Sequence, residues 1–174
     1  MAMRGLALIG CVLLACPTAR AETPPDVAAS AVPTAAQVIS RLYQFDLFQQ
    51  NAVDRTDSRA AGDVLTTAAM RAEAATKRDK ALAELQRQTG TDVPAQGKAA
   101  AMRAHSLAAA DPTDGPVYVR HFYAAQLAEY EVTVTLLENY LQSPDNEDIR
   151  RFAEAQLPTL RSELSDTRNA LADK

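Results

Sequence analysis

Apolar side chains recur every three or four positions in four long stretches of this chain, which is the period of an α-helix. The clearest pair covers residues 119–141 and a segment that ends near residue 172. A short connection at residues 142–146 joins the two, so we expect them to pack as antiparallel helices. Ser143 is a good N-cap for the second helix, and Pro144 suits the first helical position, where its missing N–H costs nothing.

Two further helical stretches precede this pair. Thr34 can cap the first, which runs to about residue 53 and has a broad apolar face. Gly62 marks the break, and the second stretch, residues 64–89, is rich in alanine, the best helix former. Gly90 ends it. The side chains of the first stretch that we expect in the core are Leu42, Phe45 and Phe48.

The remaining pattern completes an all-α prediction. Residues 96–110 form a short helix or helical connector, residues 111–116 form a loop, and no stretch alternates like a strand. The polar run at residues 77–80 is interpreted as a solvated helix face. We therefore predict a ferritin-like four-helix bundle at residues 34–174, with a short connector helix between its two helical pairs.

The N-terminal sequence has the pattern of a secretory signal peptide. Residues 1–21 contain Arg4, an apolar run at residues 5–15 and the small-x-small site Ala19-Arg20-Ala21. The apolar run is shorter than the roughly 20 residues that a membrane-spanning helix needs. Residues 22–33 follow as a linker rich in proline and alanine. We therefore expect a periplasmic protein.

The same segment has a second interpretation, because Leu13-Leu14-Ala15-Cys16 resembles a lipobox. Acylation of Cys16 would anchor the chain to a membrane, and this is the only membrane association that we consider. Cys11 and Cys16 are the two cysteines. Cleavage after Ala21, which we favour, leaves none, and this excludes a disulfide framework, a thiol nucleophile and a thiolate metal site.

Composition narrows the class of partner. The chain is 47% hydrophobic and 5% aromatic, has no tryptophan, and carries a formal net charge of −4. Loss of Arg4 and Arg20 with the signal would take that charge to −6. An acidic chain without a basic cluster argues against nucleic acid as the partner. We expect an unknown ligand or another envelope protein instead.

The C-terminal half carries a family resemblance. Gln126 follows an aromatic residue, and Phe152-Ala153 is followed by Leu157-Pro158 and Leu160. These residues resemble the bacterial DUF 4142 family, a ferritin-like domain of unknown function in exported proteins. The resemblance covers about residues 118–170 well and residues 38–85 loosely, where the run at 69–73 is similar.

Departures from the family pattern argue against a metal site. The positions at which the resemblance implies histidines hold Tyr130, Glu163 and, near Met70, about Ala74. The two histidines, His105 and His121, lie elsewhere, and no Glu-x-x-His repeat of a di-iron bundle is present. We therefore predict no resident metal and no cofactor.

Four polar residues fall on the inward stripes of the last two helices: Gln126, Tyr130, Gln156 and Glu163. We favour a hydrogen-bonded structural layer, because buried polar groups require partners. The alternative is a remnant ligand or metal pocket.

No catalytic residues can be assembled from the sequence, whether a Ser-His-Asp or Cys-His set, a phosphate loop or a paired acid and base. The predicted function is a non-catalytic binding or structural protein of the cell envelope. The alternative is a ferritin-like metal-binding or redox protein.

Pro158 lies inside the last helix and predicts a kink there, because proline removes one N–H and clashes with the carbonyl of Glu154. Equal distance from the turn pairs Gln126 with Glu163. It also places the hydroxyl of Tyr130 near the carbonyl that Pro158 leaves unpaired.

Overall fold

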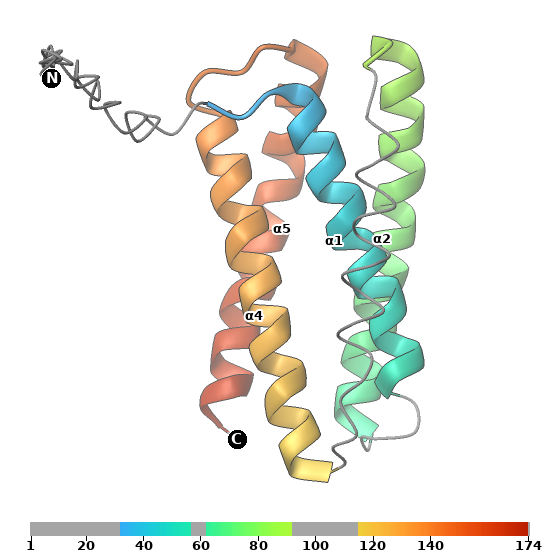
Figure 1. Cartoon of the computed structure of the whole chain (residues 1–174), viewed down its shortest axis with the longest axis vertical. Coiled ribbons are helices and arrows are strands. Elements are labelled where there is room, and N and C mark those ends of the chain that lie inside the picture. Colours follow the sequence, from blue (N-terminus) through green and yellow to red (C-terminus); the bar gives the residue numbers. More distant parts are fainter. Residues whose placement is uncertain (1–31, 57–61, 92–114, 174) are drawn as a thin grey trace, which may run out of the picture. The chain divides into compact units, whose positions relative to one another are not determined.

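The computed structural model describes residues 32–56, 62–91 and 115–173. Within them lie the helices α1 (Ala35–Thr56), α2 (Gly62–Thr89), α4 (Gly115–Tyr140) and α5 (Glu147–Ala172), and these ranges contain no strand (Figure 1). The all-α prediction is therefore confirmed. The signal at residues 1–21, all but the last two residues of the linker, and the connector at 96–110 lie outside the described residues.

The helices form two antiparallel hairpins that pack together as a bundle. α1 packs mainly on α2, and α4 packs mainly on α5, while α1 also contacts α4 and α5, and α2 contacts α5. α1 and α5 run in one direction, and α2 and α4 run in the other (Figure 1). This order of directions is that of four-helix bundles with one long crossover connection.

The start of α1 is fixed by two sets of hydrogen bonds. Thr34 Oγ1 accepts from the backbone N–H of Gln37 at 3.3 Å, and Gln37 Oε1 accepts from the N–H of Thr34 at 2.8 Å, which is a capping box. The N–H of Ala35 donates to the carboxylate of Asp145 at 2.9 Å. The connection between α4 and α5 therefore holds the end of α1.

The N-cap of α5 is Asn146, so the predicted Ser143 cap is wrong. Asn146 Oδ1 accepts from the N–H groups of Asp148 at 3.0 Å and Ile149 at 3.1 Å. The helix begins at Glu147, after a connection that extends through Asp145, and Asn146 has the extended backbone that a cap needs.

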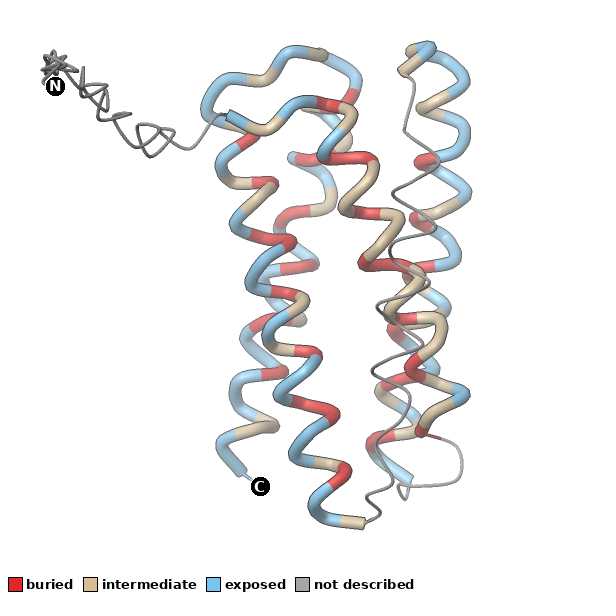
Figure 2. Tube along the Cα trace, in the orientation of Figure 1, coloured by how far each residue is buried: buried red, intermediate tan, exposed pale blue. Residues whose placement is uncertain are grey.

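The core consists of two apolar clusters on the inward faces of the helices (Figure 2). The larger lies toward the α4–α5 connection and includes Leu42, Phe45, Leu137, Ile149 and Leu160. The smaller contains Ala52, Val64, Ala68, Tyr118, Phe122 and Tyr123. Between the two, the inward positions carry polar side chains.

The prediction of the core is wrong for one of the three residues named on α1. Leu42 and Phe45 are fully buried as expected, but Phe48 is only half-buried, and the guanidinium of Arg55 lies over its ring at 5.6 Å. The buried face of α1 is rotated away from Phe48 because it includes Asp46 and Gln49.

None of the four described helices combines the length and apolar character that a membrane span requires.

Candidate functional site

Eight polar side chains from all four described helices meet between the two apolar clusters, and we call them the polar ring. Each pair of neighbouring helices contributes one hydrogen-bonded link, in the order α1–α2–α5–α4–α1. Seven of the eight side chains are buried, and one is half-buried. The ring consists of Asp46, Gln49, Arg71, Arg78, Gln126, Tyr130, Glu163 and Thr167.

The α1–α2 link is a buried ion pair. Arg78 donates to Asp46 Oδ1 from Nε at 2.7 Å and from Nη2 at 2.5 Å. Asp46 is 0% exposed and Arg78 is 6% exposed. The guanidinium of Arg78 also lies 5.2 Å from the ring centroid of Phe45, so the cation faces both a carboxylate and an aromatic ring.

Burial raises the pKa of Asp46 to about 7, although the charge and hydrogen bonds of Arg78 act in the opposite direction. The carboxylate of Asp79 raises the pKa further. The loss of hydration outweighs the ion pair here because the carboxyl group has no contact with solvent. Asp46 therefore changes its protonation state near neutral pH.

The α2–α5 and α4–α5 links meet around Tyr130. Arg71 Nη2 donates to Thr167 Oγ1 at 2.7 Å, and the Arg71 guanidinium lies 5.1 Å from the ring centroid of Tyr130. The hydroxyl of Tyr130 donates to Glu163 Oε2 at 3.1 Å. Burial raises the pKa of Tyr130 above its usual range, so the hydroxyl stays protonated and acts as a donor.

The α1–α4 link is an amide pair, in which Gln49 Nε2 donates to Gln126 Oε1 at 2.9 Å. The predicted contact between Gln126 and Glu163 is therefore wrong, since Glu163 accepts from Tyr130. Side chains in a helix lean toward its N-terminus. Tyr130 thus leans away from the α4–α5 connection and Glu163 leans toward it, which moves the pairing by one turn.

The other predicted features of α5 lie outside the ring. Gln156 is half-buried and takes no part in the four links, and Pro158 is exposed within the helix. The hydroxyl of Tyr130 contacts Glu163 rather than the carbonyl of Glu154, so the proposed link to Pro158 is wrong. The kink itself stays a prediction.

The comparisons with known proteins give one match. The chain matches the family model described as "Domain of unknown function (DUF4142)" over residues 20–170. It belongs to the DUF4142 family. No curated protein and no solved structure matches the chain.

Two of the three positions at which the resemblance implied histidines in DUF4142 proteins lie in the polar ring. They hold Tyr130 and Glu163, which are hydrogen-bonded to each other. Ala74, the approximate third position, lies on α2 between Arg71 and Arg78. The positions at which the resemblance implies imidazoles therefore hold other side chains here, and the two guanidinium groups of the ring come from different positions of α2.

These residues do not fit a di-metal centre. Asp46 is held by Arg78, Glu163 is held by Tyr130, and two interior cations would repel a metal ion. Within the described residues no group of three or more His, Cys, Asp or Glu side chains could hold a metal ion. His121 is exposed, and His105 lies outside the described residues.

The sequence-based polar layer lacked five members of the ring, and the sequence analysis placed Arg78 wrongly on a solvated face. The missing residues are Asp46, Gln49, Arg71, Arg78 and Thr167. On α2 a signal existed, because both arginines stand in a strict heptad of buried positions. These positions are Val64, Ala68, Arg71, Ala75, Arg78 and Leu82.

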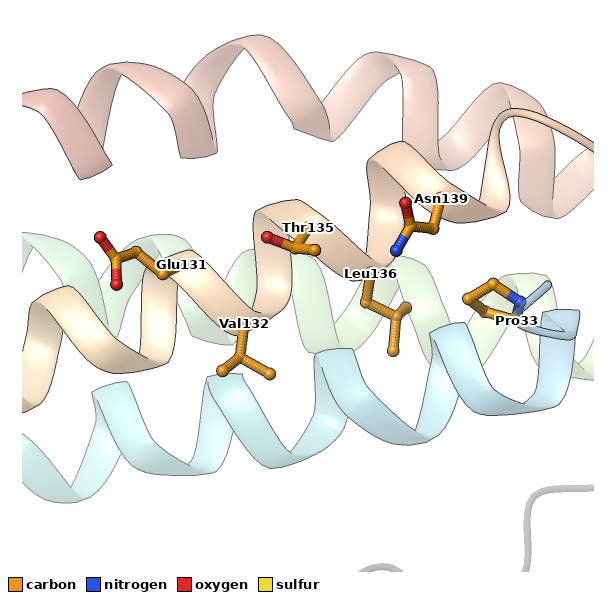
Figure 3. A pocket seen from close by; sticks show the side chains of 6 residues that line it. All are labelled: Pro33, Glu131, Val132, Thr135, Leu136 and Asn139. Carbon is orange, nitrogen blue, oxygen red and sulfur yellow. The ribbon is translucent and has the colours of Figure 1, made fainter. Parts of the chain in front are cut away.

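The described surface also has a shallow groove along α4, near the start of α1 (Figure 3). Pro33, Val132 and Leu136 supply its apolar part, and the side chains of Val132 and Leu136 point toward α1 in Figure 3. Glu131 and Asn139 also line it. No cluster of reactive groups accompanies the groove, so the polar ring is the stronger candidate site.

Proposed function

We propose that this DUF4142 protein is a non-catalytic component of the bacterial cell envelope that acts by binding or as a structural element. The polar ring is the observation that carries the proposal. Its groups bind one another across the four described helices, and its two arginines disfavour metal ions. Helical bundles commonly place ligand sites between facing helices, where this ring lies.

Metal analysis of the purified mature protein tests this proposal. The protein should contain no stoichiometric transition metal after purification without chelator, and titration with iron, zinc and manganese should give no saturable binding. The alternative function, a ferritin-like metal-binding or redox protein, requires an interior metal site. Near-stoichiometric binding that Glu163→Ala abolishes would establish that alternative and overturn the proposal.

The location in the envelope has a separate test. We propose that export removes residues 1–21, on the basis of the apolar run and the Ala19-Arg20-Ala21 site. The intact mass of the protein from a diderm host should correspond to a chain that begins at Glu22. A lipid-modified Cys16 at the N-terminus would instead place the protein on a membrane surface.

A further inference from the structure

Arg71 is a buried cation without a carboxylate partner. It is 7% exposed, and no acidic side chain of the described residues forms a salt bridge with it. Its guanidinium contacts the hydroxyl of Thr167 and the face of the Tyr130 ring, and the hydroxyl of Tyr130 in turn donates to the carboxylate of Glu163. Arg78, seven residues along the same face of α2, has the carboxylate of Asp46 as its partner. A buried charge is costly unless it is paired and hydrogen-bonded.

Arg71 Nη1 and Gln126 Nε2 are both buried donors without a hydrogen-bond partner in the described part of the chain. Buried N–H groups rarely stay unpaired in native proteins. Tyr130 and Glu163 face each other from α4 and α5, which are antiparallel, so Gln126 and Thr167 lie one turn farther along the same pair. Arg71 binds Thr167, and this places the two unpaired donors at neighbouring levels of the bundle.

The third unpaired group at this level is an acceptor, Gln49 Oε1. The amide nitrogen of the same Gln49 side chain donates to Gln126 Oε1. Gln49 therefore approaches Gln126 from α1, whereas Arg71 lies on α2. A negative ligand would therefore lie on the Arg71 side of Gln126, away from the oxygen of Gln49. The small side chains of Ala68 and Ala75 flank Arg71 along the buried face of α2.

We infer that Arg71 and Gln126 form an interior site for one small monovalent anion, with Arg71 Nη1 and Gln126 Nε2 as the donors. Arg71 supplies the positive charge of the site, and the donation from two N–H groups is the chemistry that halides and carboxylates share. The inference rests on the proposed function, because it assigns a ligand class to the interior of a binding protein.

Thermal unfolding of the purified mature protein at constant ionic strength tests the site. Sodium gluconate, whose anion is much larger than the others, is replaced stepwise by sodium chloride, nitrate or acetate. The melting temperature should rise saturably with at least one of them, by about 5 °C when the anion is far above its dissociation constant. A rise that does not saturate, or no rise with any of the three anions, would overturn the inference.

Two variants distinguish anion binding at this site from a general effect of salt on the melting temperature. Arg71→Met should abolish the anion-dependent rise, and in gluconate it should melt at or above the temperature of the unchanged protein because it removes an unpaired buried charge. Arg161→Met, which alters an exposed arginine on α5, should keep the full rise. Equal anion responses in both variants would refute the site.

Bromide soaked into crystals of the unchanged protein tests the site without a variant, so the result does not depend on whether a variant folds. Anomalous scattering should place one bromide ion within hydrogen-bonding distance of Arg71 Nη1 and Gln126 Nε2, and a well-ordered water there instead would reject the anion. Failure of these experiments leaves the proposed non-catalytic function intact. Stoichiometric metal binding would remove that function without deciding the anion site.

Discussion

At the scale of single residues, Asp46 has the most unusual environment among the described residues with a shifted pKa. Its carboxyl group is fully buried, and its pKa is raised to about 7. An aspartate in an unfolded chain has a pKa of about 3.9. The folded state therefore binds more protons than the unfolded state between about pH 4 and pH 7.

The free energy of unfolding should consequently contain a contribution from Asp46 that falls as the pH rises through this window. Its slope should not exceed about 1.4 kcal/mol per pH unit, and it should vanish above pH 7. Urea unfolding between pH 4.5 and 8 should show a flatter profile for Asp46→Asn. Asp54→Asn, which changes an exposed carboxylate on the same helix, is the control. Parallel profiles for Asp46→Asn and the unchanged protein would contradict the raised pKa.

The two phenylalanines of α1 give a matched pair. Phe45 is 0% exposed and packs edge-on against Tyr130 with ring centroids 4.9 Å apart, whereas Phe48 is half-buried. Phe45→Ala should cost about 3–5 kcal/mol, because it opens a cavity in the core. Phe48→Ala should cost less than half as much. Denaturant unfolding of both variants measures the difference, and equal costs would mean that α1 is rotated relative to this structure.

At the scale of elements, the start of α5 depends on one side chain. Asn146 Oδ1 satisfies two N–H groups of the first turn, and alanine there should cost about 1 kcal/mol. Ser143→Ala should change the free energy of unfolding by only a few tenths of that cost of about 1 kcal/mol, because Ser143 is an exposed residue of the connection, outside the cap. Chemical unfolding of both variants checks this. A larger loss for Ser143→Ala would restore the sequence-based cap.

At the scale of the whole molecule, the amide pair of Gln49 and Gln126 joins the first hairpin to the second through the core. Gln126→Leu alone leaves the buried amide of Gln49 without a partner, which should cost about 1–3 kcal/mol. The Gln49→Leu/Gln126→Leu double variant removes both amides. It should therefore be more stable than the sum of the two single changes implies. Additive free energies of unfolding would show that the amides do not act as a pair.

The polar ring also joins the two hairpins, together with the larger apolar cluster, which has members from all four described helices. α1 and α2 share one buried link, and α4 and α5 share another, but the remaining two links cross between the hairpins. Further crossings come from Arg41 on α1, which donates to Thr133 and Glu129 on α4, and from the N–H of Ala35, which donates to Asp145 at the end of the bundle. A variant that weakens a crossing link should therefore lower the stability of both hairpins together.

The sequence by itself determined the helical class, the approximate span of each described helix and the break before Gly62. These features follow from periodicity, capping and glycine, which act over a few neighbouring residues. It also placed Gln126 and Tyr130 inside, because their spacing on one helix fixes their face.

Only the tertiary structure decided which polar groups pair. Arg71 and Arg78 are long charged side chains, which are usually solvated, and their burial depends on Asp46, Thr167 and Tyr130 from three other helices. The register of α4 against α5 likewise follows from where Asn146 starts the helix and from the lean of side chains across the interface. Local sequence fixes the face that a residue occupies, but the partner comes from a distant segment, and the packing of the bundle determines which one it is.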